Sequence, residues 1–126
     1  MNKKKILVID DEPGFTEMVK LNLEATGYYH VRVENRGANA LQAAINFQPN
    51  LILLDVIMPD AEGPEICYQI QNNKHVKHIP VVFLTATIRR DEVEAHNGNI
   101  GGHAFIAKPS GLQDLIECIE SHISPS

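Results

Sequence analysis

The chain has 126 residues, of which 44% are hydrophobic and 21% charged, so its length and composition predict one globular domain with one core and exclude a disordered chain. The net charge of −5 argues against nucleic-acid binding through phosphate contacts, which needs a basic face. No stretch is apolar for long enough to span a membrane, and the first apolar run is too short for a signal peptide, so we expect a cytoplasmic protein.

Strand and helix patterns alternate from the start of the chain. The first apolar run, Lys5–Ile9, predicts a strand, and Pro13 suits the first turn of the helix that follows. Gly27 supplies a left-handed stop for this helix. Tyr29–Glu34 alternates between apolar and polar residues, as a half-covered edge strand does, and Gly37–Phe47 has apolar residues on one face, which predicts a second helix.

The second half of the chain repeats this alternation. Three further strands and three further helices are expected, in chain order, at Leu51–Leu54 (strand), Gly63–Asn72 (helix), Pro80–Leu84 (strand), Ile88–Asn97 (helix), His103–Ala107 (strand) and Leu112–Ile123 (helix). Strands that alternate with helices imply right-handed crossovers, hence a five-stranded parallel sheet with helices on both faces. The sequence therefore predicts an α/β fold, one three-layer doubly wound domain.

Asp55 stands out because it ends a run of four apolar residues, Leu51–Leu54, that reads as a strand buried on both faces. It would then lie at the carboxyl end of a central strand, where open α/β sheets bind ligands. Taken alone, however, an aspartate at a strand end is more often a turn or helix-cap residue. The rest of the chain has to decide between these two interpretations.

Other polar residues also follow predicted strands: Asp10 and Asp11, Thr85, and Lys108. In a parallel sheet they all meet Asp55 at one edge. Three carboxylates at one edge repel one another unless a cation joins them, and a hard divalent cation such as Mg²⁺ prefers oxygen ligands. Each residue has a plain alternative, as a helix cap, a strand-end hydroxyl or a surface lysine, but their coincidence at matching strand ends points to phosphoryl chemistry.

The residue types suggest a division of roles. Asp55 is the candidate nucleophile that accepts a phosphoryl group, while Asp10 and Asp11 form a pair suited to holding the metal. Lys108 would neutralise charge on the transferring group, and the Thr85 hydroxyl would hydrogen-bond a phosphoryl oxygen after transfer.

These residues occur within motifs that resemble the receiver domain of two-component response regulators. The motifs appear in order over nearly the whole chain: Asp10-Asp11-Glu12-Pro13, Leu54-Asp55-Val56-Ile57-Met58-Pro59 with Gly63, Leu84-Thr85-Ala86, and Ala107-Lys108-Pro109. The resemblance implies a flavodoxin-like receiver fold of strand order 2-1-3-4-5. It also implies that Asp55 is phosphorylated by a partner histidine kinase or phosphotransfer protein, so that the chain is a phosphoacceptor and not an ordinary enzyme.

The resemblance also implies a set of contacts around the phosphoryl group. Mg²⁺, or Mn²⁺ in its place, would be bound by Asp11, Asp55 and the backbone carbonyl of Ile57, with Asp10 acting mainly through water. Lys108 and the backbone of Ala86 would contact the phosphoryl group, and the Lys108–Pro109 bond would be cis.

A switch is implied as well, in which Thr85 moves toward the phosphoryl group and Phe105 turns inward behind it. The alternative is that Phe105 is only a core aromatic of the fifth strand. The output surface would be the fourth helix, fifth strand and fifth helix. Ile57 departs from the family pattern because its side chain cannot position the attacking water, so we predict a long-lived phosphoryl state.

Two other functions fit the same residues: a Mg-dependent aspartyl-phosphate phosphatase, and a receiver that is never phosphorylated and only scaffolds a complex. A flavin-binding protein is disfavoured because acidic residues, and not a Ser/Thr/Gly-rich loop, follow the first strand. Residues 1–126 are expected to form a single receiver domain, with its core at about 4–123 and no output domain. The signal would pass to a downstream protein or a fused output domain, from a monomer at rest that can dimerise on phosphorylation.

Overall fold

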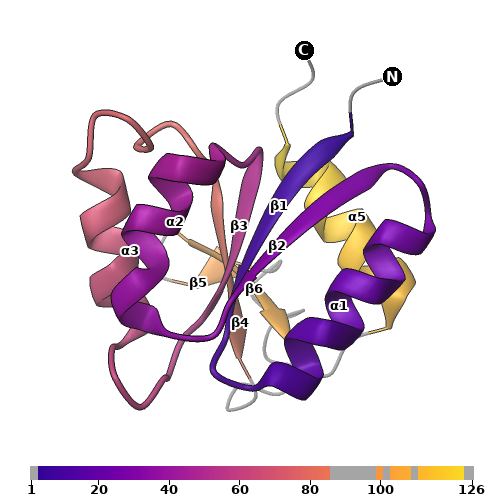
Figure 1. Ribbon diagram of the computed structural model, residues 1–126, viewed down its shortest axis with the longest axis horizontal. Helices are drawn as coiled ribbons and strands as arrows, with labels where there is room; N and C mark the ends of the chain where they lie inside the picture. The colour runs from indigo at the N-terminus through magenta and orange to yellow at the C-terminus, as the bar shows by residue number, and fades with distance from the viewer. Residues whose placement is uncertain (1–2, 86–98, 101–102, 109–110, 124–126) are drawn as a thin grey trace.

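The computed structural model describes residues 3–85, 99–100, 103–108 and 111–123 (Figure 1). The described elements follow the predicted alternation, and in chain order they are β1 (Lys4–Ile9), α1 (Pro13–Ala25), β2 (Tyr29–Glu34), η1 (Gly37–Asn39, a 3₁₀ turn), α2 (Ala40–Phe47), β3 (Leu51–Asp55), α3 (Gly63–Gln71), β4 (Val81–Thr85), β5 (Asn99–Ile100), β6 (His103–Ala107) and α5 (Leu112–His122). None of the helices within these ranges is long and apolar enough to cross a membrane.

The sheet confirms the predicted topology. Its strands lie in the order β2-β1-β3-β4-β6-β5, and the first five of these are parallel. Since β6 is the fifth strand expected from the sequence, the predicted order 2-1-3-4-5 is correct. The short β5, which pairs antiparallel with β6 at the sheet edge, was not predicted, because two residues between glycines carry no apolar pattern.

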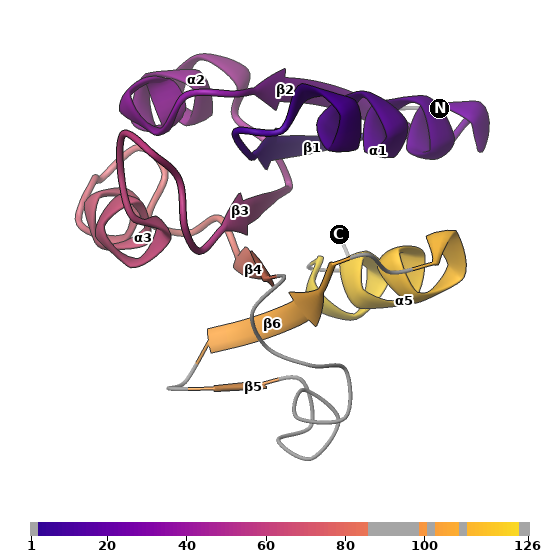
Figure 2. The same ribbon diagram turned by 90° about the horizontal axis from the view of Figure 1, so that it is seen from below.

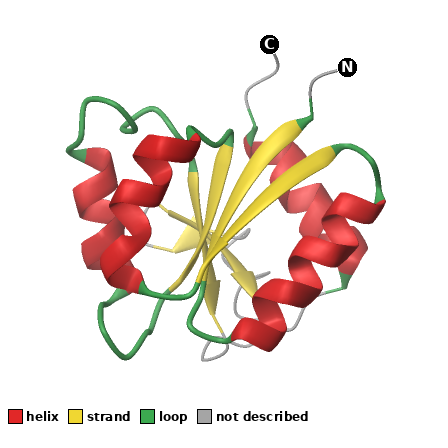
Figure 3. Cartoon of the chain, viewed as in Figure 1, coloured by secondary structure: helices red, strands yellow, loops and turns green. Residues whose placement is uncertain are grey.

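Among the described elements, α1 and α5 cover one face of the sheet, and α2 and α3 cover the other (Figures 2 and 3). Alternate residues of the strands point into these two layers, as the pleat requires. Leu51 and Leu53 face the α1–α5 side, whereas Ile52 and Leu54 face the α2–α3 side. All four are fully buried, so β3 is covered on both faces, as its continuous apolar run predicted.

The structure confirms one predicted helix end and changes the start of another predicted helix. Gly27 has a φ of 83°, the left-handed conformation predicted for the stop after α1. The predicted helix Gly37–Phe47 instead begins as the 3₁₀ turn η1 before α2. The expected helix at Ile88–Asn97 lies outside the described residues.

Candidate functional site

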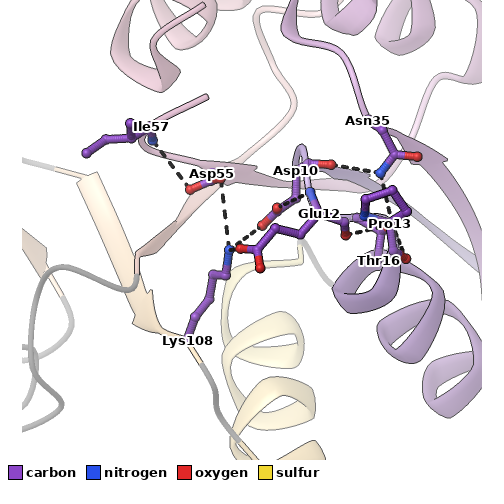
Figure 4. A network of polar contacts seen from close by, with 8 residues as sticks. All are labelled: Asp10, Glu12, Pro13, Thr16, Asn35, Asp55, Ile57 and Lys108. Carbon is purple, nitrogen blue, oxygen red and sulfur yellow. Dashed lines mark hydrogen bonds and ion pairs between the residues drawn. The ribbon is translucent and has the colours of Figure 1, made fainter. Parts of the chain in front are cut away.

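The sheet brings the polar strand-end residues together at its carboxyl edge (Figure 4). Asp10 directly follows β1, Asp55 ends β3, and Thr85 ends β4; all three are buried. The register explains the proximity, because Asp55 lies beside Leu84 of β4, and Thr85 lies beside Ala107, the residue before Lys108. The predicted cluster therefore forms through strand pairing.

Three carboxylates form the acidic part of the site. Asp10, Asp11 and Asp55 each place a carboxylate oxygen within 4.8 Å of the others. Burial, and after it the neighbouring Asp10 carboxylate, raise the pKa of Asp55 to about 6, although the Lys108 ammonium opposes both effects. Three clustered carboxylates, two of them buried, fit a hard divalent cation, because such a cation prefers oxygen ligands and would relieve the remaining repulsion.

Lys108 lies against this acidic group. Its ammonium Nζ is 2.7 Å from Asp10 Oδ2 and 2.8 Å from Glu12 Oε1, but 3.9 Å from Asp55 Oδ2. The same nitrogen lies 4.7 Å from the centre of the Phe15 ring. Burial by itself would lower the pKa of Lys108, but the bonds to Asp10 and Glu12 more than offset it and the pKa is raised. The lysine is therefore a fixed cation at the site.

Glu12 and Phe15 were not predicted as contacts of Lys108. Glu12 follows the aspartate pair directly, so its place at the same edge was a usable signal. Phe15 lies in the first turn of α1, and its contact with Lys108 could be found only by knowing how α1 packs against the sheet.

The loop between β3 and α3 carries Ile57 and is closed at its base. The Ile57 N–H lies 3.4 Å from Asp55 Oδ1, while the Gly63 N–H donates to the Val56 carbonyl at 2.7 Å. Ile57 also forms an antiparallel bridge with Glu62. The Ile57 side chain is 61% exposed and points away from Asp55 (Figure 4). Only the backbone of Ile57 therefore faces the acidic group.

The connection between β2 and α2 was not identified from the sequence as part of the site. Asn35 donates through Nδ2 to the Asp10 carbonyl at 2.8 Å and to Thr16 Oγ1 at 3.0 Å. Asp60, in the β3–α3 loop, accepts the N–H groups of Ala38 at 2.9 Å and Gly37 at 3.1 Å. These two bonds lower the pKa of Asp60, and the bond from Ala38 has the larger effect.

The predicted switch residues lie along neighbouring strands. Phe105, on β6, is partly buried and its ring packs against Phe83 of β4, with the ring centres 5.1 Å apart. This contact is what a core aromatic makes, so a switching role for Phe105 stays a prediction. Ala86 and Pro109 lie outside the described residues, and so their predicted roles stay predictions too.

Known proteins match this chain over nearly its whole length. A family model described as a response regulator receiver domain matches residues 6–120. The polar-differentiation response regulator DivK of Brucella anthropi is 31% identical over 121 residues, which cover 95% of this chain and 96% of DivK. The chemotaxis protein CheY4 of Vibrio cholerae superposes with a TM-score of 0.81 at 25% identity, over 97% of this chain and all of that one.

A further solved structure shares this fold. The receiver domain of the sensor histidine kinase PA1611 from Pseudomonas aeruginosa has a TM-score of 0.79 at 21% identity, over 96% of this chain and 98% of that one. That structure is described with a magnesium ion coordinated in the active site cleft. At this identity the likeness establishes the shared fold alone.

Proposed function

Because this chain belongs to the response regulator receiver domain family, we propose that Asp55 accepts a phosphoryl group from a partner histidine kinase or phosphotransfer protein in a Mg²⁺-dependent reaction. The observation that carries the proposal is the position of Asp55. It is a carboxylate with only 6% of its surface exposed, close to two further carboxylates and 3.9 Å from the Lys108 ammonium. A buried carboxylate in this setting can attack phosphorus once a cation balances the charge.

The site residues would divide the work as follows. One Asp55 oxygen attacks the phosphorus, and the bond from phosphorus to the donor's leaving atom breaks. Asp11, Asp55 and the Ile57 carbonyl would hold Mg²⁺, which neutralises charge on the phosphoryl oxygens when bound. Lys108 would turn from Asp10 and Glu12 toward a phosphoryl oxygen, and the buried Thr85 hydroxyl would hydrogen-bond another.

Incubation with acetyl phosphate and Mg²⁺, followed by intact-mass measurement and an assay for free phosphate, tests the proposal. We expect one phosphoryl group per chain, and none when EDTA replaces Mg²⁺. Rapid continuous release of phosphate would favour the aspartyl-phosphate phosphatase instead. A chain that binds Mg²⁺ but takes up no phosphoryl group would favour the scaffold alternative.

The affinity for Mg²⁺ is expected to depend on pH through Asp55. Its pKa of about 6 in the metal-free protein means that protons compete with the cation below that pH. The dissociation constant should rise about tenfold for each pH unit below 6 and stay nearly constant from pH 7 to 8. Calorimetric titrations between pH 5 and 8 measure this, and equal affinities at pH 5 and pH 7 would contradict it.

Replacing Ile57 by Asn is expected to shorten the life of the phosphoryl group. The exposed Ile57 side chain offers no donor or acceptor to an attacking water, whereas an amide offers both. We expect dephosphorylation to become faster by on the order of tenfold, which corresponds to about 1.4 kcal/mol of transition-state stabilisation. Decay of the phosphorylated protein, followed by mass after removal of acetyl phosphate, gives the rate; Ile57→Val is the control, and equal decay of all three proteins would refute the idea.

The remaining expectations concern organisation. We propose that residues 1–126 act as one receiver domain that signals through a downstream protein or a fused output domain. A monomer at rest, dimerisation on phosphorylation and a cytoplasmic location all stay predictions. Because Phe105 has no hydroxyl, a partner would read the phosphorylated state through shape and packing.

A further inference from the structure

The short connection between β2 and α2 touches both halves of the site. Asn35 bonds to the Asp10 carbonyl at one end of this connection, and the N–H groups of Gly37 and Ala38 bond to Asp60 at the other. Asp10 belongs to the carboxylate group, whereas Asp60 belongs to the loop that carries the Ile57 carbonyl. The connection therefore links the three carboxylates to the loop of the Ile57 carbonyl, the two sets of groups that would hold the cation.

The tip of the β3–α3 loop is held by its bonds to the β2–α2 connection. The base of the loop is closed by the Gly63 N–H to Val56 carbonyl bond, and the Met58 side chain is buried in the core. Beyond Met58 the chain returns to the surface, where Asp60 is exposed but has both carboxylate oxygens bonded. Asp60 thus fixes the outer end of the loop.

The packing at Gly37 shows that this contact is close. A Cβ atom added to Gly37 would lie 2.8 Å from Ala61 Cβ and 3.2 Å from Asp60 Oδ1. Contacts this short leave no room for a side chain, so the loop tip lies directly on the 3₁₀ turn. Any movement of the tip must break the two bonds of Asp60 or open this contact.

We propose that Asp60 is a positioning residue for the divalent cation: by binding the Gly37 and Ala38 N–H groups, it holds the Ile57 carbonyl at a fixed place relative to Asp10, Asp11 and Asp55. Asp60 acts through the loop and is not itself a ligand, because its oxygens are already bonded. The inference rests on the proposed Mg²⁺ site and adds a residue that controls its geometry.

A positioning role has a signature that a charge effect lacks. Mg²⁺ demands near-ideal octahedral geometry with short ligand distances, whereas Ca²⁺ accepts longer distances and irregular arrangements. Loosening the loop should therefore weaken Mg²⁺ binding far more than Ca²⁺ binding. Loss of one negative charge, in contrast, weakens the binding of both divalent cations by a similar factor.

Calorimetric titration of Mg²⁺ and Ca²⁺ into four proteins tests this: wild type, Asp60→Ala, Asp60→Asn and Glu62→Gln. The last is the matched control, since it removes one charge from an exposed side chain of the same loop. We expect Asp60→Ala to weaken Mg²⁺ binding about tenfold and Ca²⁺ binding by no more than about twofold, the range typical of groups that orient metal ligands. Asp60→Asn keeps one acceptor oxygen and should lie between Asp60→Ala and wild type.

Two further measurements separate the possible causes. Thermal unfolding in EDTA reports any loss of stability, and Glu120→Gln provides a destabilised control at the opposite end of the sheet, where Glu120 accepts bonds from Lys4 and Tyr29. That control should keep the wild-type ratio of Mg²⁺ to Ca²⁺ affinity. The amide signal of Ile57 should also shift on Mg²⁺ addition in the wild type and shift less in Asp60→Ala.

Equal losses of Mg²⁺ and Ca²⁺ affinity in Asp60→Ala, or losses matched by Glu62→Gln, would overturn the positioning role while leaving the metal site intact. Failure of the wild type to bind Mg²⁺ at all would instead overturn the proposed function. If Asp60→Ala does not fold, Asp60→Asn alone carries the comparison, and an unchanged ratio in it would refute the inference.

Discussion

Asp55→Asn is expected to abolish phosphoryl incorporation completely and, in the metal-free protein, to increase stability. The amide has no negative charge with which to attack phosphorus, so the loss should be total and not partial. Acetyl phosphate with Mg²⁺ should then give no added mass. Incorporation at the wild-type level would show that another residue is the acceptor.

The gain in stability follows from the pKa of Asp55. Burial raises it from 3.8 in the unfolded chain to about 6 in the folded one, so the folded protein binds the proton more tightly. Between these two values the folded state carries more protons, and stability falls as the pH rises through this window. Above it the carboxylate is charged in both states and the full cost remains.

The Asn variant removes that cost at neutral pH. One pKa unit corresponds to about 1.4 kcal/mol, so the stability at pH 7 should rise by on the order of 1–3 kcal/mol. Urea unfolding in EDTA measures the difference, which should shrink toward pH 4, where Asp55 is protonated in the folded wild type. A variant less stable than the wild type at pH 7 would contradict this reading of the acidic cluster.

Gly63→Ala is expected to lower the stability of the fold and to disturb the site as well. A Cβ atom at this position would lie 2.3 Å from the Asp55 carbonyl oxygen and 2.9 Å from Val56 Cα. Both neighbours are backbone atoms, so α3 cannot keep its place unless the end of β3 moves. We expect a loss of about 1–3 kcal/mol, typical of overpacked buried positions. Because the displaced backbone is that of Asp55 itself, phosphorylation of the folded fraction should also slow.

Gly14→Ala is the matched control for this substitution. Gly14 lies in the first turn of α1, and no atom lies within 4 Å of an added Cβ. The same chemical change there should be neutral or stabilise by about 0.5–1 kcal/mol, because alanine favours the helix. Urea unfolding of both variants, with phosphorylation assayed in parallel, completes the comparison. If the Gly63→Ala protein is as stable as Gly14→Ala, the end of β3 can move at little cost in free energy and the prediction is wrong.

Much of the fold was predictable because its signals are local. The four apolar residues before Asp55 predict a strand buried on both faces, and the structure buries all of them. Alternation of strands and helices restricts the connections to right-handed crossovers, which leads to a parallel sheet. In such a sheet Asp10, Asp55, Thr85 and Lys108 all lie at one edge, so their proximity can be predicted although the distances between them cannot.

The sequence by itself therefore determined the alternation of strands and helices and the acidic, hydroxyl and lysine groups of the site, since periodicity and strand ends are written in neighbouring residues. The strand order followed from the resemblance of its motifs to receiver domains. Tertiary structure alone decided which partner each group meets. Lys108 contacts Glu12 and Phe15, and Asp60 closes on Gly37, only because separate helices and loops pack against the same edge. These contacts join residues 23 to 96 positions apart, and no local pattern encodes a distance between atoms that come together only after the sheet has formed.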